Sequence, residues 1–125
     1  MSLKWDYVGV VSSDLNRSVE FYRLVGIPLP DADSDHVEVE LSGGFRFALD
    51  SLELMKSLGP WEEPKGHRMG MGINAGTAAG VDEAYKKIVD AGFEGHTEPF
   101  DAFWGQRYAQ VKDPDGNPVD LYAPL

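Results

Sequence analysis

The segment Tyr108-Ala-Gln-Val-Lys-Asp-Pro-Asp-Gly-Asn-Pro-Val-Asp-Leu-Tyr122 carries the strongest structural signal in the chain. Its centre, residues 113–117, has the composition of a tight turn, because proline pre-sets one dihedral angle and glycine or asparagine accepts a positive φ. Apolar residues flank the turn on both sides, which predicts a β-hairpin. Asp120 lies four residues after Gly116, among the apolar residues of the returning strand. Burying a carboxylate without a partner is expensive, so Asp120 belongs either to a functional cleft or to the solvated face of an alternating strand.

Length and composition limit the classes of protein that need to be considered. A chain of 125 residues with 42% hydrophobic and 26% charged residues suits one globular domain. No run approaches the roughly 20 apolar residues that cross a membrane, and the first residues lack the pattern of a signal peptide. There is no cysteine, which excludes disulfides and thiolate chemistry. We therefore expect a cytoplasmic protein with no membrane partner.

The charge balance argues against nucleic acid as a partner. Twenty-one acidic and 11 basic residues give a formal net charge of −10, whereas affinity for nucleic acid depends on lysine and arginine. An acidic surface favours solubility, and it also attracts cationic small molecules. Charge alone does not separate these two roles.

A weak internal duplication organises the chain. In the first half, an apolar run at 7–11 predicts a strand, Ser12-Ser13-Asp14 offers N-capping oxygens, and apolar residues at helical spacing lead to Gly26. Residues 36–41 and 45–49 flank Gly43-Gly44 and predict a hairpin. Segment 52–58 is apolar and contains methionine, which suits a helical flap over a cleft or ordinary packing against the other half.

The second half repeats this order of elements. Residues 68–73 predict a strand, residues up to Gly92 predict a helix, and the hairpin around Gly116 follows. We place module one at 4–58, a proline- and glycine-rich connector at 59–66 and module two at 67–125, within one domain. Each half reads as a strand, a helix and a hairpin, with a poorly marked strand expected between helix and hairpin, so the pattern is βαβββ twice.

The C-terminal motif from Val111 to Leu121 resembles the vicinal-oxygen-chelate superfamily. That superfamily groups glyoxalase I, extradiol dioxygenases, fosfomycin-resistance enzymes and bleomycin-resistance proteins. The resemblance implies an α+β fold of tandem βαβββ modules whose curved mixed sheets enclose a cleft, often in a homodimer. In metal-dependent members, the fourth residue after the turn glycine is a carboxylate metal ligand, which corresponds here to Asp120.

The resemblance also implies a test for a metal, because the ligands of the family come as symmetric pairs from the first and last strands of each half. The equivalent positions, counted along the sequence, are Tyr7, Ala48, Arg68 and Asp120. Divalent cations prefer imidazole or carboxylate ligands, and this set offers one carboxylate. We therefore expect no metal and no other cofactor, with Arg68 paired to Asp120 instead. The alternative is a shifted ligand set that holds Zn, Ni, Mn or Fe and consists of Tyr7, His67 and Asp120. The other two histidines, His36 and His96, are interpreted as surface or edge residues.

Aromatic residues before the final hairpin suggest a binding surface. Phe103 and Trp104 adjoin Gly105, in a segment similar to the corresponding part of bleomycin-resistance proteins, and they offer stacking and cation–π surface. The alternative is that these aromatics only cover the open edges of small sheets. The expected cleft residues are Tyr7, Trp61, Arg68, Phe103, Trp104, Gln106, Tyr108 and Asp120.

Three functional hypotheses follow from the sequence. The first is a metal-free protein that binds, and sequesters, an aromatic or cationic small molecule. The second is a metal-dependent lyase or dioxygenase with the shifted ligand set. The third is an interaction or regulatory domain with a vestigial cleft. No serine elbow, phosphate loop or dinucleotide fingerprint is present, so we favour binding over catalysis.

Overall fold

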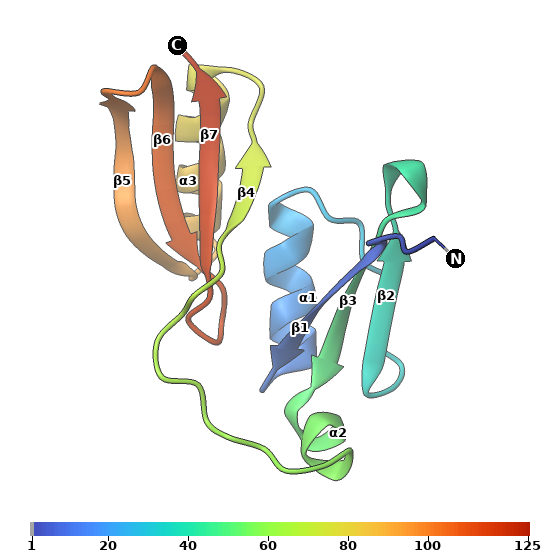
Figure 1. Ribbon diagram of the computed structural model, residues 1–125. Helices are drawn as coiled ribbons and strands as arrows, with labels where there is room; N and C mark the ends of the chain where they lie inside the picture. Colours follow the sequence, from blue (N-terminus) through green and yellow to red (C-terminus); the bar gives the residue numbers. More distant parts are fainter. Residues whose placement is uncertain (1) are drawn as a thin grey trace. The chain divides into compact units, whose positions relative to one another are not determined.

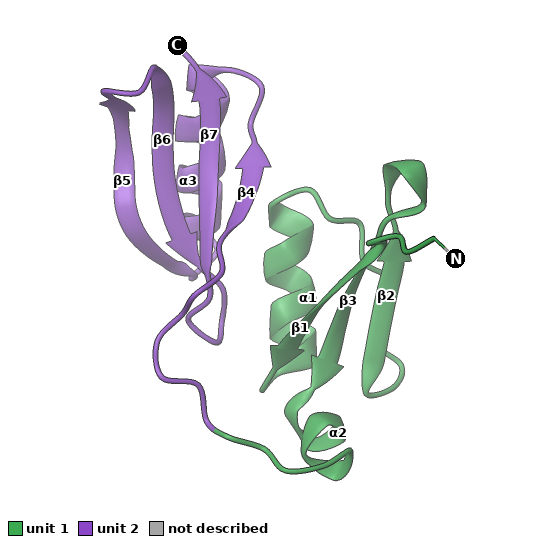
Figure 2. Ribbon diagram, viewed as in Figure 1, with its two compact units in different colours: residues 1–62 green, residues 63–125 purple. Residues whose placement is uncertain are grey.

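The computed structural model describes residues 2–125, which form two compact units. The division falls between Glu62 and Glu63, inside the segment predicted as a connector (Figure 2). No helix among the described residues is long and apolar enough to span a membrane. The units are described separately below.

Unit 1 is a three-stranded sheet with one long helix across it (Figure 1). The elements are β1 (Tyr7–Ser12), α1 (Leu15–Leu24), β2 (His36–Glu40), a 3₁₀ turn (Ser42–Gly44), β3 (Arg46–Ser51) and α2 (Leu52–Ser57). The strand order is β1-β3-β2, with β1 parallel and β2 antiparallel to β3. Strand β2 is therefore an edge strand that pairs only with β3.

Unit 2 is a four-stranded sheet with α3 against one face (Figure 1). Its elements are β4 (Met71–Asn74), α3 (Ala78–Asp90), β5 (Glu94–Ala102), β6 (Gln106–Lys112) and β7 (Pro118–Pro124). The strand order is β4-β7-β6-β5. The parallel pair β4–β7 repeats the parallel pair β1–β3 of unit 1, so the predicted duplication is visible in the sheet topology.

The two long helices begin at polar caps, and the cap of α1 lies in the segment predicted for it. The Asp14 carboxylate accepts a hydrogen bond from the backbone N–H of Arg17 at 3.2 Å, and the Thr77 hydroxyl accepts one from the N–H of Gly80 at 3.0 Å. Each cap satisfies an N–H that the first helical turn leaves without a partner. After α1 and α3 the chain turns at Gly26 and Gly92, both with φ of 93°, a conformation that favours glycine.

Each unit has its own apolar core between helix and sheet. In unit 1, Tyr22 of α1 packs against Phe47 of β3, with ring centroids 4.9 Å apart, and both side chains are buried. In unit 2, Ile88 of α3 and Leu121 of β7 are buried on the helix-covered face. Burying an aliphatic or aromatic side chain stabilises a fold by about 1.5–3 kcal/mol. These cores occupy one face of each sheet, and the other face is left for polar residues.

The predicted hairpin of residues 108–122 is confirmed as β6 and β7. The backbone N–H of Gly116 donates to the carbonyl of Asp113 at 3.0 Å, and Gly116 has φ of 85°. The Asp113 side chain is 4% exposed and accepts hydrogen bonds from the backbone N–H groups of Asp115 and Asn117 and from the Asn117 amide. This buried carboxylate ties the turn together.

Two expectations about the elements need correction, and a third segment is now defined. The second half was predicted to start its strand at Arg68, but β4 begins at Met71 and Arg68 lies in the preceding segment. The extra strand between helix and hairpin exists only in unit 2, as β5; residues 25–35 form no strand, because Pro28 and Pro30 lack the N–H that a ladder needs. Segment 52–58 contains the short helix α2, which has no buried residue.

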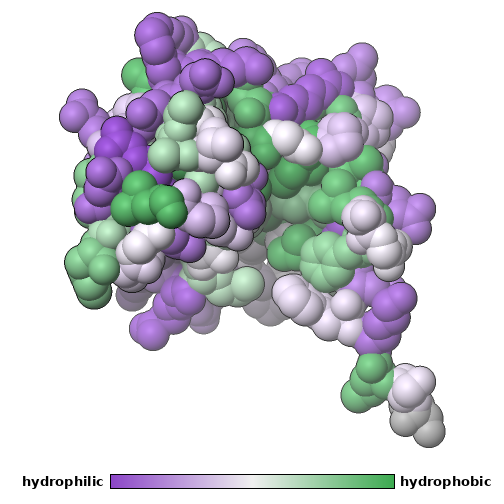
Figure 3. Space-filling model, turned by 90° about the horizontal axis from the view of Figure 1, so that it is seen from above, coloured by the Kyte–Doolittle hydropathy of each residue, from purple (hydrophilic) through white to green (hydrophobic). Residues whose placement is uncertain are grey.

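Hydrophilic residues are prominent on the face shown in Figure 3, with hydrophobic residues exposed among them. Large hydrophobic side chains with at least 72% exposure in the described chain are Leu3, Trp5, Leu58, Met69 and Phe103. The Trp5 ring lies 5.0 Å from that of Phe45, while most of the Trp5 surface stays exposed.

Candidate functional site

The open face of the unit 2 sheet contains a pocket of about 420 Å³. Successive residues of a strand point to opposite faces, so the side chains that alternate with the core residues of β6 and β7 line this side. The antiparallel register pairs Tyr108 with Tyr122 and Gln110 with Asp120. The residues that line the pocket are Gly72, Trp104, Gln106, Tyr108, Asp120 and Tyr122.

Asp120 is held in place by two hydrogen bonds to the same carboxylate oxygen. Oδ1 accepts from the Tyr108 hydroxyl at 2.8 Å and from the Gln110 Nε2 at 2.9 Å. Burial first, and then the hydrogen bond and negative charge of Asp120, raise the pKa of Tyr108 to about 12. Tyr108 therefore stays protonated at physiological pH and acts as a hydrogen-bond donor.

The second oxygen of Asp120 remains available for a ligand. Within residues 2–125 no group donates a hydrogen bond to Oδ2, and every fully buried side-chain polar atom of a non-exposed residue has a partner. Because Oδ2 has no such partner, it is not fully buried. Asp120 lines the pocket, so Oδ2 is accessible from there. An ionised carboxylate is an acceptor only, so this oxygen suits a donor group, above all a cationic one.

Aromatic rings form one wall of the pocket. The Trp104 ring lies 5.3 Å from that of Tyr108 at an interplanar angle of 73°, and its indole N–H donates to Gln106 Oε1 at 2.8 Å. Phe100 meets Tyr108 edge-on at 5.8 Å. Edge-to-face contacts fix ring orientation and leave ring faces free. Trp104 is 49% exposed, so part of its ring surface is open to solvent.

Four residues predicted for the site line this pocket: Trp104, Gln106, Tyr108 and Asp120. Phe103 contacts Trp104 at 5.1 Å but is 96% exposed and does not line the pocket. Tyr7 and Trp61 belong to unit 1. Sequence reasoning missed Gln110 and Tyr122, although both follow from the period of two, since each lies two residues from a predicted site residue on the same strand.

Gly72 was also missed, and it explains how the pocket keeps its shape. Gly72 of β4 pairs with Asp120 of β7. A Cβ at this position would lie 3.3 Å from the ring of Tyr122, which is tighter than ordinary packing. The missing side chain therefore leaves room for the Tyr122 ring beside Asp120.

The strand register changes the counterpart of Tyr7. Gly9 pairs with Ala48 in unit 1 as Gly72 pairs with Asp120 in unit 2. Tyr7 lies two residues before Gly9 and seven residues before the N-cap of α1, Asp14. In unit 2, the residue at the same two distances, before Gly72 and before the N-cap Thr77, is Gly70. Gly70, and not Arg68, is thus the equivalent of Tyr7. The expected ion pair of Arg68 with Asp120 is not present among the described residues, where Tyr108 and Gln110 are the partners of Asp120.

The residues present do not fit the metal that the family resemblance implies. Alanine and glycine offer no ligand atom at two of the four positions, and the pKa of Tyr7 is raised by burial and by the charge of Asp50, which disfavours a phenolate ligand. The shifted set requires His67, which lies in the exposed segment before β4. Within residues 2–125 no three His, Asp or Glu side chains are grouped to hold a metal ion. Usual metal sites draw three or more such ligands from the protein.

Comparison with known proteins agrees with the fold and the sequence motif. A family model described as Glyoxalase/Bleomycin resistance protein/Dioxygenase superfamily matches residues 4–121. The chain therefore belongs to this superfamily, and the resemblance inferred from the C-terminal motif is confirmed. No curated protein matches the chain.

Solved structures of similar proteins cover nearly the whole chain. A glyoxalase/bleomycin resistance protein/dioxygenase from Nocardioides is 25% identical, with a TM-score of 0.76, over 100% of this chain and 85% of that one. A family enzyme from Burkholderia phytofirmans PsJN is 17% identical, with a TM-score of 0.82, over 98% and 100%. A hypothetical protein from S. aureus is 19% identical, with a TM-score of 0.81, over 98% and 94%. These matches confirm the predicted α+β fold.

Proposed function

We propose that the unit 2 pocket binds a small organic molecule that carries a protonated amine and a flat aromatic portion, without a resident metal. The observation that carries the proposal is the free Oδ2 of Asp120 beside the rings of Trp104, Tyr108 and Tyr122. The protein then acts by holding the molecule, which is the sequestering function expected from the sequence.

Charge supports a cationic ligand. Tyr108 and Gln110 satisfy Oδ1 of Asp120, and they fix the direction in which Oδ2 accepts a hydrogen bond. A charge-assisted hydrogen bond from an ammonium group is roughly twice as strong as a neutral one. The formal net charge of −10 also attracts cations to the protein from a distance.

The aromatic wall supports a ligand with a flat ring. A cation near the face of a tryptophan or tyrosine gains about 0.5–2 kcal/mol, and an aromatic ring gains further by stacking or edge contact. Trp104 and Tyr108 are already oriented by their contacts with each other and with Gln106. The ligand therefore does not have to order them when it binds, which lowers the entropic cost.

The volume of the pocket sets the size of the ligand. A space of about 420 Å³ lies within the range of roughly 300–1,000 Å³ that is usual for small-molecule sites. One fused ring system with a short amine-bearing chain suits this volume. Tryptamine is a suitable probe, and N-acetyltryptamine, which lacks the positive charge, is its matched neutral counterpart.

The test is isothermal titration calorimetry with both probes in the presence of EDTA. We expect tryptamine to bind the wild type at least tenfold more tightly than N-acetyltryptamine, and Asp120→Asn to remove this difference. Glu83→Gln is the control. Glu83 is exposed on α3, so this substitution removes the same charge at a position away from the pocket. Equal affinity for the two probes, or no effect of Asp120→Asn, would overturn the proposal.

A metal arm separates this proposal from the alternative of a metal-dependent lyase or dioxygenase. The titration is repeated without EDTA after dialysis against Zn²⁺, Ni²⁺, Mn²⁺ or Fe²⁺. Affinity that does not change with the metal supports the metal-free pocket. Binding that appears only with one of the ions would overturn it in favour of the metal-dependent alternative.

A further inference from the structure

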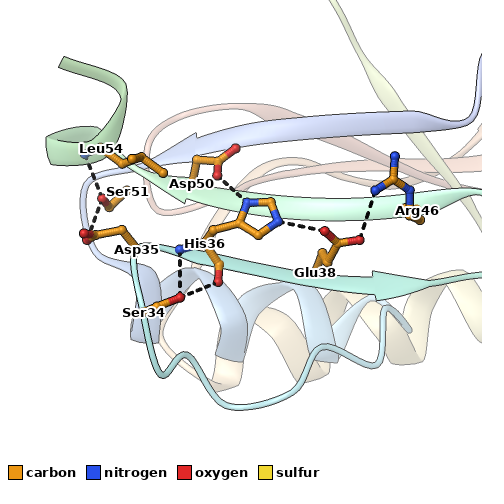
Figure 4. A network of polar contacts seen from close by, with 8 residues as sticks. All are labelled: Ser34, Asp35, His36, Glu38, Arg46, Asp50, Ser51 and Leu54. Atoms are coloured by element: carbon orange, nitrogen blue, oxygen red, sulfur yellow. Dashed lines mark hydrogen bonds and ion pairs between the residues drawn. The ribbon is translucent and has the colours of Figure 1, made fainter. Parts of the chain in front are cut away.

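His36 lies between two carboxylates on the open face of the unit 1 sheet (Figure 4). Its Nδ1 is 2.5 Å from Oδ1 of Asp50 on β3, and its Nε2 is 2.8 Å from Oε1 of Glu38 on β2. The Nε2 distance is that of a charge-assisted hydrogen bond, and the Nδ1 distance is shorter still. The interpretation of His36 as a surface or edge residue agrees with its place on edge strand β2, and the structure adds its two carboxylate partners.

The geometry favours the protonated ring. An ionised carboxylate can only accept hydrogen bonds, so both ring nitrogens must donate, and a histidine that donates from both nitrogens is the imidazolium cation. The hydrogen bonds to Glu38 and to Asp50 raise the pKa of His36 above its ordinary value, and partial burial opposes them. The hydrogen bond from His36 in turn lowers the pKa of Glu38.

Other charged groups extend the cluster across the sheet. Arg46 of β3 donates to Oε2 of Glu38 at 3.4 Å and lies 3.8 Å from Asp6. The Arg46 guanidinium also lies 5.0 Å from the centre of the Tyr7 ring on β1. Negative groups thus face His36 at both nitrogens, and Arg46 pairs with the far oxygen of Glu38.

The residue before His36 connects the cluster to α2. The Ser51 hydroxyl donates to Asp35 Oδ1 at 2.8 Å and accepts from the N–H of Leu54 at 3.0 Å, so it caps α2 (Figure 4). The Ser51 N–H also donates to the Asp35 carbonyl at 2.8 Å. A change in the position of β2 at His36 is therefore passed to the start of α2 through Asp35.

This arrangement is not a metal site. Asp50 and Glu38 contact opposite nitrogens of one ring, so the two carboxylates and the imidazole do not point at one shared position. A metal ion would also require the neutral imidazole. The cluster is instead an ion pair network that needs a proton on each nitrogen.

We propose that His36 is a pH-operated latch, which fastens edge strand β2 to β3 and to the start of α2 while its ring is protonated. When the ring loses a proton, one nitrogen no longer donates, and its lone pair faces a carboxylate oxygen. Loss of the proton at Nδ1 breaks the contact of β2 with Asp50 on β3, and loss at Nε2 releases Glu38, which Arg46 of β3 also contacts. Since β2 pairs with β3 alone among the described strands, loss of this contact favours its local opening.

The direction of the pH effect follows from linkage. A group whose pKa is raised in the folded state stabilises the fold. This stabilisation is fully present below the pKa of the unfolded state, and it is lost as pH rises through the pKa of the folded state. The latch is therefore closed in mildly acidic solution, and it opens as pH rises past the pKa of His36, which lies above the ordinary 6.5.

The first test is an NMR titration of the histidine ring signals. We expect His36 to titrate above 6.5 in the wild type, and to titrate lower in Asp50→Asn and in Glu38→Gln, each of which removes one charged acceptor. A wild-type value at or below 6.5, or a value that both variants leave unchanged, would overturn the proposal.

The second test is amide hydrogen exchange of residues 36–40, corrected for the intrinsic effect of pH. In the wild type, we expect the protection of β2 to fall about threefold as pH passes the His36 pKa, a size typical of partly exposed ion pairs. In His36→Gln, protection is already low and does not change with pH. His96→Gln, which removes an exposed histidine of β5, is the control and should behave as the wild type. The same pH dependence in wild type and His36→Gln would contradict a latch.

Discussion

Replacing Asp113 by alanine tests whether one buried carboxylate holds the β6–β7 hairpin. Its side chain is 4% exposed and accepts three hydrogen bonds, at 2.9 Å from Asp115 N–H and at 2.8 and 2.7 Å from the backbone and side chain of Asn117. Alanine keeps the backbone but removes every one of these acceptor contacts. The turn must then rely on its backbone hydrogen bonds.

The size of the effect follows from the three contacts. A hydrogen bond to a charged group contributes about 1.5–3 kcal/mol, and a neutral one about 1 kcal/mol. The donors sit in a turn where water can reach them after the substitution, so we take about 1 kcal/mol for each. The free energy of unfolding of unit 2 should therefore fall by about 3 kcal/mol, a large share of the 5–15 kcal/mol typical of a domain.

Urea unfolding followed by tryptophan fluorescence and circular dichroism measures this change. With a slope of about 1.5 kcal/mol per molar urea, the midpoint should fall by about 2 M. Glu83→Ala, which removes an exposed carboxylate from α3, should change the midpoint by no more than a surface substitution does. A loss below about 1 kcal/mol in Asp113→Ala, or an equal loss in the control, would refute the reasoning.

Three further predictions concern other parts of the molecule. Gly80→Ala should lower the free energy of unfolding of unit 2 by about 1–2 kcal/mol in urea unfolding. The added Cβ would lie 2.4 Å from the Ala75 carbonyl oxygen, and this clash outweighs the gain of about 1 kcal/mol in helix propensity. Tyr108, followed by NMR, should ionise near pH 12 in the wild type and at a lower pH in Asp120→Asn. Burial still raises the pKa of Tyr108 in this variant, but the negative charge that opposes ionisation is removed. In thermal unfolding, the stability of unit 1 should be greatest between the ordinary pKa of Glu38, 4.5, and that of His36, 6.5. It should fall as pH drops through the lowered pKa of Glu38 and as pH rises through the raised pKa of His36.

Each of these has an outcome that contradicts it. A Gly80→Ala protein as stable as the wild type would mean that the start of α3 adjusts freely. A Tyr108 pKa that is the same with aspartate and asparagine at position 120 would separate the tyrosine from the carboxylate. A flat pH profile for unit 1, or one identical in His36→Gln, would remove the role given to the ion cluster.

Local chemistry made part of the structure predictable. The hairpin from Tyr108 to Tyr122 follows from a turn whose residues each have a defined backbone preference, and Asp14 is recognisable as an N-cap before a helical pattern. The shared face of Gln106 and Tyr108 follows from the period of two along a strand. These signals lie within a few residues of one another, so sequence order alone carries them.

Contacts between distant residues were not predictable in the same way. His36 and Asp50 meet because the register of β2 against β3 places them opposite each other, and that register depends on the 3₁₀ turn between the strands. The equivalence of Tyr7 with Gly70 likewise needed the pairing of Gly72 with Asp120, because the irregular segment before β4 hides the start of the strand. A shift of register changes which residues share a face.

The most direct test of the account is the position of ligand binding in unit 2. We would record ¹H–¹⁵N spectra of the labelled protein in EDTA while adding tryptamine, and follow the indole N–H signal of Trp104, which donates to Gln106 in the free protein. The account predicts a saturable shift of this signal in the wild type and in Glu83→Gln, and an affinity about tenfold weaker in Asp120→Asn. No saturable shift at Trp104, or the same affinity in Asp120→Asn as in the wild type, would contradict the claim that the carboxylate and the aromatic wall form one binding site.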